Sequence, residues 1–204
     1  MLVAGAALMA IGASIPFFAS SLSDAPWSDD WDELAPAIAG NPSAWMWANL
    51  LFLASAIATA FGLWILSKRF EGKARVLADT GALAFTFAAV LSLIDRIISI
   101  SVASWAAEAS LPSNDTTVQA FIRMDEGFSM GFFVLGFLAV SLFGLAMTNT
   151  SSDRTYGGWI TAVGVLGILT AIVGFAIPAF VYLATTALGV IALTSLVSGA
   201  DNPG

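Results

Sequence analysis

Four polar side chains are spaced so that they share one face of a predicted membrane helix. Ser92, Asp95, Arg96 and Ser99 stand at positions i, i+3, i+4 and i+7, and this spacing places them along one side of an α-helix. Ionisable groups inside a membrane are costly, so by default they indicate a functional site. The face predicts either the lining of a proton, ion or solute path, or a hydrogen-bonded knot that fixes helix packing, which is the commoner use of polar groups inside a bundle.

The acid and the base of this face are sequence neighbours. Adjacent residues point about 100° apart on a helix, so we expect Asp95 and Arg96 each to find a partner on another segment. Asp125 and Glu126 are candidates for the arginine. The full set of candidate partners is Asn49, Arg123, Asp125, Glu126, Ser129 and Tyr182.

The sequence offers few groups for catalysis. It contains no Cys and no His, which argues against disulfides, thiolate nucleophiles, His-ligated metals or haem, and His acid–base chemistry. We find no nucleotide-binding loop, no pair of inward carboxylates and no Ser nucleophile beside a base. We therefore expect no enzyme activity, no catalytic residue, no metal and no cofactor, although a bound lipid or pigment is compatible with the composition.

The polar face belongs to the long apolar segment 76–105. As a helix this segment would measure about 45 Å, more than the roughly 30 Å of a hydrocarbon core. Asp95 precedes the predicted interface anchor Trp105 by ten residues, so it lies about 15 Å deeper. The whole chain agrees with a membrane location, because 58% of its 204 residues are hydrophobic and only 10% are charged, too few for the surface of a soluble domain.

The apolar segments predict one all-α domain, a bundle of six transmembrane helices with short loops. The last two spans come from a single apolar block that is about twice as long as a bilayer core is thick, so it must fold back near Gly174 and Pro178. Five spans with one re-entrant helix are the alternative. The predicted spans cover residues 2–20, 45–66, 76–105, 127–147, 158–175 and 177–198.

The loops between these spans differ in charge. Loops 21–44 and 106–126 are acidic, whereas loop 67–75 holds four of the seven basic residues. Because basic loops stay in the cytoplasm, this bias predicts that both termini are cytoplasmic and that the protein lies in a cell membrane, which we expect to be prokaryotic. Each acidic loop can also form a short interfacial helix, one at residues 32–38 and one that ends at Met124.

Two other residue types help to place the spans. Trp45, Trp47 and Trp64 bracket the second span, and indole rings favour the two bilayer interfaces. Small residues predict where helices touch, because they let backbones approach closely. The candidates are Gly127 and Gly131, which form a GxxxG motif, and Gly164 and Gly167.

The layout of six short-looped spans resembles small uncharacterised bacterial membrane proteins of families with unknown function. The resemblance rests on this layout and on the Gly-Gly-Trp-Ile sequence at residues 157–160, which leads into a Gly-rich terminal hairpin. It implies a helical membrane fold and brings no catalytic residues with it.

These observations predict a non-catalytic accessory or scaffolding subunit of a larger membrane protein complex. Its partners would be the lipid bilayer and either other membrane subunits or further copies of the chain, and not nucleic acid. The alternative is a small transporter or channel that uses the Asp95/Arg96 face.

Overall fold

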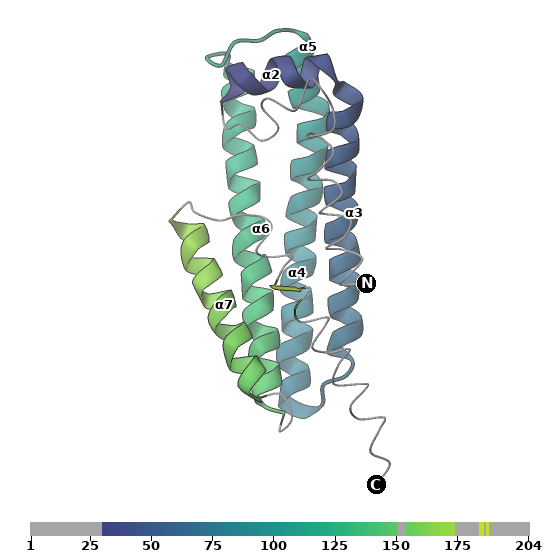
Figure 1. The fold of residues 1–204 in the computed structure, drawn as a ribbon, viewed down its shortest axis with the longest axis vertical. Helices are drawn as coiled ribbons and strands as arrows, with labels where there is room; N and C mark the ends of the chain where they lie inside the picture. The colour runs from purple at the N-terminus through teal and green to yellow at the C-terminus, as the bar shows by residue number, and fades with distance from the viewer. Residues whose placement is uncertain (1–29, 151–153, 174–183, 186, 188–204) are drawn as a thin grey trace.

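The structure is a computed structural model that describes residues 30–150, 154–173, 184, 185 and 187. In these residues all regular structure is helical (Figure 1), as the sequence predicted. The helices are α2 (Trp31–Gly40), α3 (Pro42–Ser67), α4 (Gly72–Ile98), the π-helix η1 (Ser99–Ala103), α5 (Ser104–Glu108), α6 (Thr116–Thr148) and α7 (Arg154–Ile172).

Four helical segments are long and apolar enough to cross a bilayer. They are α3, α6, α7 and the segment Gly72–Glu108, in which α4, η1 and α5 follow one another without a break. The protein is therefore a helical membrane protein, and four of the six predicted spans are in place. The span predicted at residues 2–20 and the turn near Gly174 and Pro178 lie outside the described residues, and of the span predicted at 177–198 only residues 184, 185 and 187 are described.

The long helices stand side by side, with α4 between α3 and α6 and with α7 packed against α6 (Figure 1). At one end of the bundle α2 lies across the others and contacts α5. We call this the acidic end, because it carries Asp30, Asp32, Glu33, Glu108 and Asp115. We call the opposite end the basic end, because it carries Lys68, Arg69, Lys73, Arg75 and Arg154.

Side chains that accept from free backbone N–H groups define where several helices begin. The Asp30 carboxylate accepts from the N–H of Asp32 at the start of α2, and the Asp115 carboxylate accepts from the N–H of Thr117 at the start of α6. Such N-caps stabilise a helix by about 1 kcal/mol. The short helix predicted at residues 32–38 is thus present as α2, with slightly wider bounds.

The second predicted interfacial helix is not a separate element. The sequence predicts that this helix ends at Met124 and that a span begins at residue 127, but α6 continues without interruption from Thr116 to Thr148. Gly127 is the only helix-weakening residue near the expected break, and a glycine inside a helix costs only about 1 kcal/mol. As a result Asp125 belongs to a long helix and not to a loop.

Two of the tryptophans predicted as interface anchors instead bind other helices. Trp45 is 4% exposed, and its indole N–H donates to the carbonyl oxygen of Ser99 over 3.0 Å. The Trp64 N–H donates to the Thr86 hydroxyl, also over 3.0 Å. Trp47, which is 56% exposed, keeps the outward orientation that an anchor needs.

The helices α6 and α7 approach each other through glycine. A Cβ atom on Gly157 would lie 2.6 Å from the backbone nitrogen of Thr148 and 2.7 Å from the carbonyl oxygen of Gly144, so a larger residue does not fit. Gly164 and Gly167 are buried against Ser141 and Phe137 of α6 in the same way. In the predicted GxxxG pair, Gly131 faces Leu91 of α4, whereas Gly127 is exposed and has open space around it.

Candidate functional site: an ion pair buried among three helices

Asp95 and Arg96 form an ion pair with each other, between Oδ2 of the aspartate and Nη2 of the arginine. This direct pair was not expected from the sequence, whereas the expected partners on other segments are also present, because Asn49 of α3 binds Arg96 and Asp125 of α6 interacts with Asp95. The long, flexible arginine stem lets the guanidinium turn back toward the neighbouring carboxylate, although the two Cβ atoms point in different directions. The Asp95 side chain is 4% exposed and that of Arg96 is 18% exposed, so the pair is largely buried.

Helix α3 completes the surroundings of the guanidinium. Arg96 Nη1 donates to the amide oxygen of Asn49 over 3.0 Å, and the guanidinium carbon lies 5.7 Å from the centre of the Phe52 ring. Asn49 is fully buried, and its amide nitrogen donates to the carbonyl oxygen of Trp45 over 2.9 Å. The oxygen and the nitrogen of the Asn49 amide therefore each make a hydrogen bond. The arginine is held by an ion pair, a hydrogen bond and a cation–π contact.

The π-helix η1 begins three residues after Arg96 and provides the next contact. The Ser99 carbonyl oxygen that accepts from the Trp45 indole lies at the start of η1. In a π-helix the hydrogen bonds run from i to i+5, and such turns are frequent at functional sites. Trp45 and Asn49 are one turn apart on α3, so together they hold α4 and η1 at two successive turns. We call the set Trp45, Asn49, Asp95, Arg96 and Ser99 the polar clamp.

One atom of the polar clamp has no hydrogen bond in the described part of the chain. Asp95 Oδ1 is buried and has no donor, while the Asp125 carboxylate of α6 is close enough to interact with Asp95. The sequence analysis predicted no pair of inward carboxylates, and the structure corrects this prediction. Asp125 was assigned to a loop, whereas the unbroken helix α6 carries it along the side of α4.

The other predicted site residues fall in different places. Ser92 and Ser99 are buried on the same α4–η1 face as Asp95. Arg123 and Glu126, predicted as partners of the clamp, pair with each other over 3.5 Å on an exposed part of α6. Ser129 is half-buried on α6, and Tyr182 lies outside the described residues.

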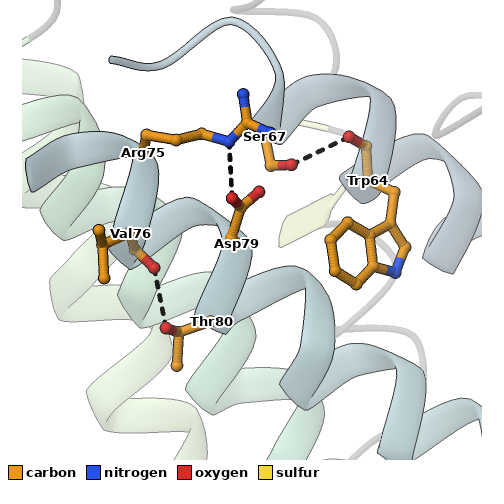
Figure 2. A network of polar contacts seen from close by, with 6 residues as sticks. All are labelled: Trp64, Ser67, Arg75, Val76, Asp79 and Thr80. Carbon is orange, nitrogen blue, oxygen red and sulfur yellow. Dashed lines mark hydrogen bonds and ion pairs between the residues drawn. The ribbon is translucent and has the colours of Figure 1, made fainter. Parts of the chain in front are cut away.

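A second charged cluster, at the basic end, was not singled out from the sequence. Arg75 Nε donates to Asp79 Oδ2 over 2.7 Å, as Figure 2 shows. The Ser67 hydroxyl, which donates to the carbonyl oxygen of Trp64, also interacts with Asp79. The signal was available, because Arg75 and Asp79 stand at i and i+4 with opposite charges, a spacing that brings side chains together on a helix.

The geometry of these two clusters limits what the described residues can do chemically. No group of three or more acidic side chains among them is arranged to hold a metal ion. The guanidinium of the polar clamp is committed to Asp95, Asn49 and Phe52, which leaves Asp95 Oδ1 and the facing Asp125 as the uncommitted groups at the clamp. At the basic end, Asp79 Oδ1 is also buried without a hydrogen bond to any described residue.

Comparison with known proteins adds no assignment. No protein-family model matches the chain, and neither a curated protein nor a solved structure matches it. The resemblance in layout to small bacterial six-span proteins therefore stays a prediction.

Proposed function

We propose that the protein is a non-catalytic accessory or scaffolding subunit that assembles with other proteins in a membrane. One observation carries the proposal: the guanidinium of Arg96 pairs with Asp95 on its own helix α4 and reaches α3 through Asn49 and Phe52. A buried charge that is held from three sides serves helix packing, and it does not present a positive group to a substrate.

The outward surface of the bundle supports the same proposal. Large apolar side chains remain exposed along α3 and along α7, where lipid or neighbouring subunits can cover them. On α3 these are Met46, Trp47, Ile57, Phe61 and Ile65, and on α7 they are Tyr156, Trp159, Val163, Val165, Leu166, Leu169 and Ile172.

Two measurements test the assembly directly. The first is purification from native membranes in mild detergent, where we expect larger membrane proteins at a fixed stoichiometry. The second uses the absence of native cysteine: a thiol-attached photo-cross-linker on Phe61→Cys or Leu166→Cys should capture the same partner in intact membranes. The buried variant Ala56→Cys is the matched control and should not capture it. A stable homo-oligomer without other proteins in both measurements would contradict the proposal.

The orientation in the membrane is part of the proposal. The basic end would face the cytoplasm and the acidic end the outside, because positively charged loops are retained in the cytoplasm. Asn114 and Lys73 are exposed at opposite ends of the bundle. In intact cells an impermeant thiol reagent should label Asn114→Cys and not Lys73→Cys. The reverse pattern would contradict this orientation.

A second candidate function is a small transporter or channel that uses the Asp95/Arg96 face. The observation in its favour is the buried Asp95 Oδ1, which has no hydrogen-bond donor in residues 30–150 and 154–173. For this function, Asp95→Asn would abolish proton or solute flux into liposomes while the protein remains folded. For the proposed subunit, the same substitution weakens folding and no flux is lost.

A further inference from the structure

We propose that Asp95 and Asp125 together bind one proton, which is held between their carboxylates while Arg96 provides the fixed counter-charge. The proposal that Asp95 and Asp125 bind a proton does not rest on the proposed function. A bound proton is compatible with a packing element, in which it stays in place, and with a transporter, in which it exchanges.

The register of α4 against α6 brings the two residues together. The rings of Phe85 and Phe132 lie 6.2 Å apart, and a Cβ atom on Gly131 would lie 2.6 Å from Leu91. The two helices run antiparallel, because the later residue on α4, Leu91, contacts the earlier residue on α6, Gly131. One helical turn further toward the acidic end, the same register places Asp95 beside the turn of α6 that contains Asp125.

Among the carboxylate oxygens of Asp95, Oδ1 is the atom that can share a proton. Oδ2 of Asp95 is committed to Arg96, whereas Oδ1 is buried and has no donor. A buried carboxylate oxygen without a donor is costly, typically by about 1 to 3 kcal/mol. A proton between Oδ1 and the Asp125 carboxylate removes this cost, because the oxygen then takes part in a hydrogen bond.

The cluster of Asp95, Asp125 and Arg96 lacks one positive charge when both acids are ionised. Asp95 and Asp125 carry two negative charges when both are ionised, and Arg96 supplies one positive charge. From α3 the facing polar group is the neutral amide of Asn49. Further along α6, Arg123 and Glu126 neutralise each other at the surface. The cluster therefore has a net charge of −1, and like charges in a membrane interior are strongly unfavourable.

A proton fits this space better than a metal cation. Hard metal cations take about six or more oxygen ligands, whereas the cluster offers the uncommitted oxygens of two carboxylates. Two carboxylates can share one proton, as in other close pairs of acids. In this step one O–H bond forms on one carboxylate, the proton is donated in a hydrogen bond to the other, and no bond to carbon breaks. Asp125 is half-buried, so the proton can enter from the acidic end.

Infrared spectroscopy of the full chain in lipid nanodiscs tests the proposal. At neutral pH the wild-type protein should show the C=O stretch of one protonated carboxyl group, which shifts in D2O and disappears as the pH is raised. Asp125→Asn should lose this band, because Asp95 then stays ionised beside Arg96. Glu126→Gln is the matched control, since it changes the adjacent, exposed acid, and it should keep the band.

The test stays decisive even where a variant folds poorly. Asp95→Asn should also lose the band, but the conclusion does not need that variant, because the wild-type and Asp125→Asn spectra suffice. Absence of the band in the wild-type protein at every pH, or its persistence in Asp125→Asn, would overturn the proposal. Loss of the band when sodium chloride replaces choline chloride at constant pH would show a metal cation in place of the proton, and would also overturn it.

Discussion

Asp79 and Asp95 lie on the same helix, and each carboxylate binds an arginine of that helix, but the two ends of α4 use the arrangement differently. At the basic end, the Asp79 and Arg75 side chains are 36% and 29% exposed and meet across one helical turn. At the acidic end, the Asp95 side chain is 4% exposed, and its arginine continues to α3 through Asn49. The first pair lies within one helix at the surface, whereas the second joins two helices in the interior.

The comparison shows that the two ends of the bundle are held together by different interactions. At the basic end, backbones approach closely where Gly157 packs against Gly144, and apolar rings such as Phe143 fill the centre. At the acidic end, the Trp45 indole donates to Ser99 and Arg96 donates to Asn49, so hydrogen bonds join α3 to α4 and η1, beside an apolar cluster that includes Trp31 and Phe121. Mutations of the polar clamp and of the glycine contacts should therefore fail for different reasons: loss of charge or of a donor in the clamp, and loss of space at the glycines.

The largest effect is expected for Asp95→Asn. Arg96 then loses its bound counter-charge, and breaking a buried ion pair costs about 3 to 5 kcal/mol. We expect a value near the lower limit, because Asp125 can replace part of the charge. Thermal unfolding in detergent measures the loss. The double variant Asp95→Asn/Arg96→Gln should recover much of it, and an Asp95→Asn protein of wild-type stability would contradict the structural role of the pair.

A smaller loss is expected where the backbones of α6 and α7 touch. Gly157→Ala places a methyl group against Thr148 and Gly144, and such overpacking costs about 1 to 3 kcal/mol. Gly158→Ala is the matched control, since open space surrounds that position, and its higher helix propensity should leave stability unchanged or raise it by about 0.5 kcal/mol. Equal unfolding temperatures for the two variants would show that the close approach does not contribute to stability.

Trp45→Phe tests a single hydrogen bond of the polar clamp. The ring volume is largely kept, but the Ser99 carbonyl loses its indole donor, and the loss of one such hydrogen bond costs about 0.5 to 1.5 kcal/mol. Trp47→Phe removes an exposed indole on the same helix and should be neutral in detergent. If both variants unfold alike, the contact between α3 and η1 depends on ring packing and not on the hydrogen bond.

Asp79→Asn should have the smallest effect of the four. The pair with Arg75 is partly exposed, and pairs of this kind contribute about 0.2 to 1 kcal/mol. The same unfolding assay measures it beside Asp95→Asn. An equal loss for the two substitutions would remove the difference between the two ends of α4 that the structure indicates.

The sequence was sufficient to predict the helical membrane class, the four described spans and the polar face of Ser92, Asp95 and Ser99. These features follow from local composition and from helical periodicity. Asn49 was correctly named as a candidate partner of the face, but the direct pair of Asp95 with Arg96 was missed because side-chain flexibility overcame the angle between neighbouring Cβ atoms. Asp125 was named as a partner for the arginine, but its place beside Asp95 on a continuous helix was not foreseen, because whether a helix continues through Gly127 depends on its packing against α4, which a local sequence window does not contain.

The π-helix η1 also determines which way the side chains after it point around the helix axis. One extra residue in a turn rotates everything that follows by about 100° relative to a regular α-helix. Before η1, the buried side of α4 faces α3 and α6; after it, Ala106 and Ala107 face α2 and pack near Trp31. A single chain segment thereby changes neighbours without a loop. The length of η1 is thus a constraint on the bundle, since removal of one residue there would turn α5 away from the helix that covers the acidic end.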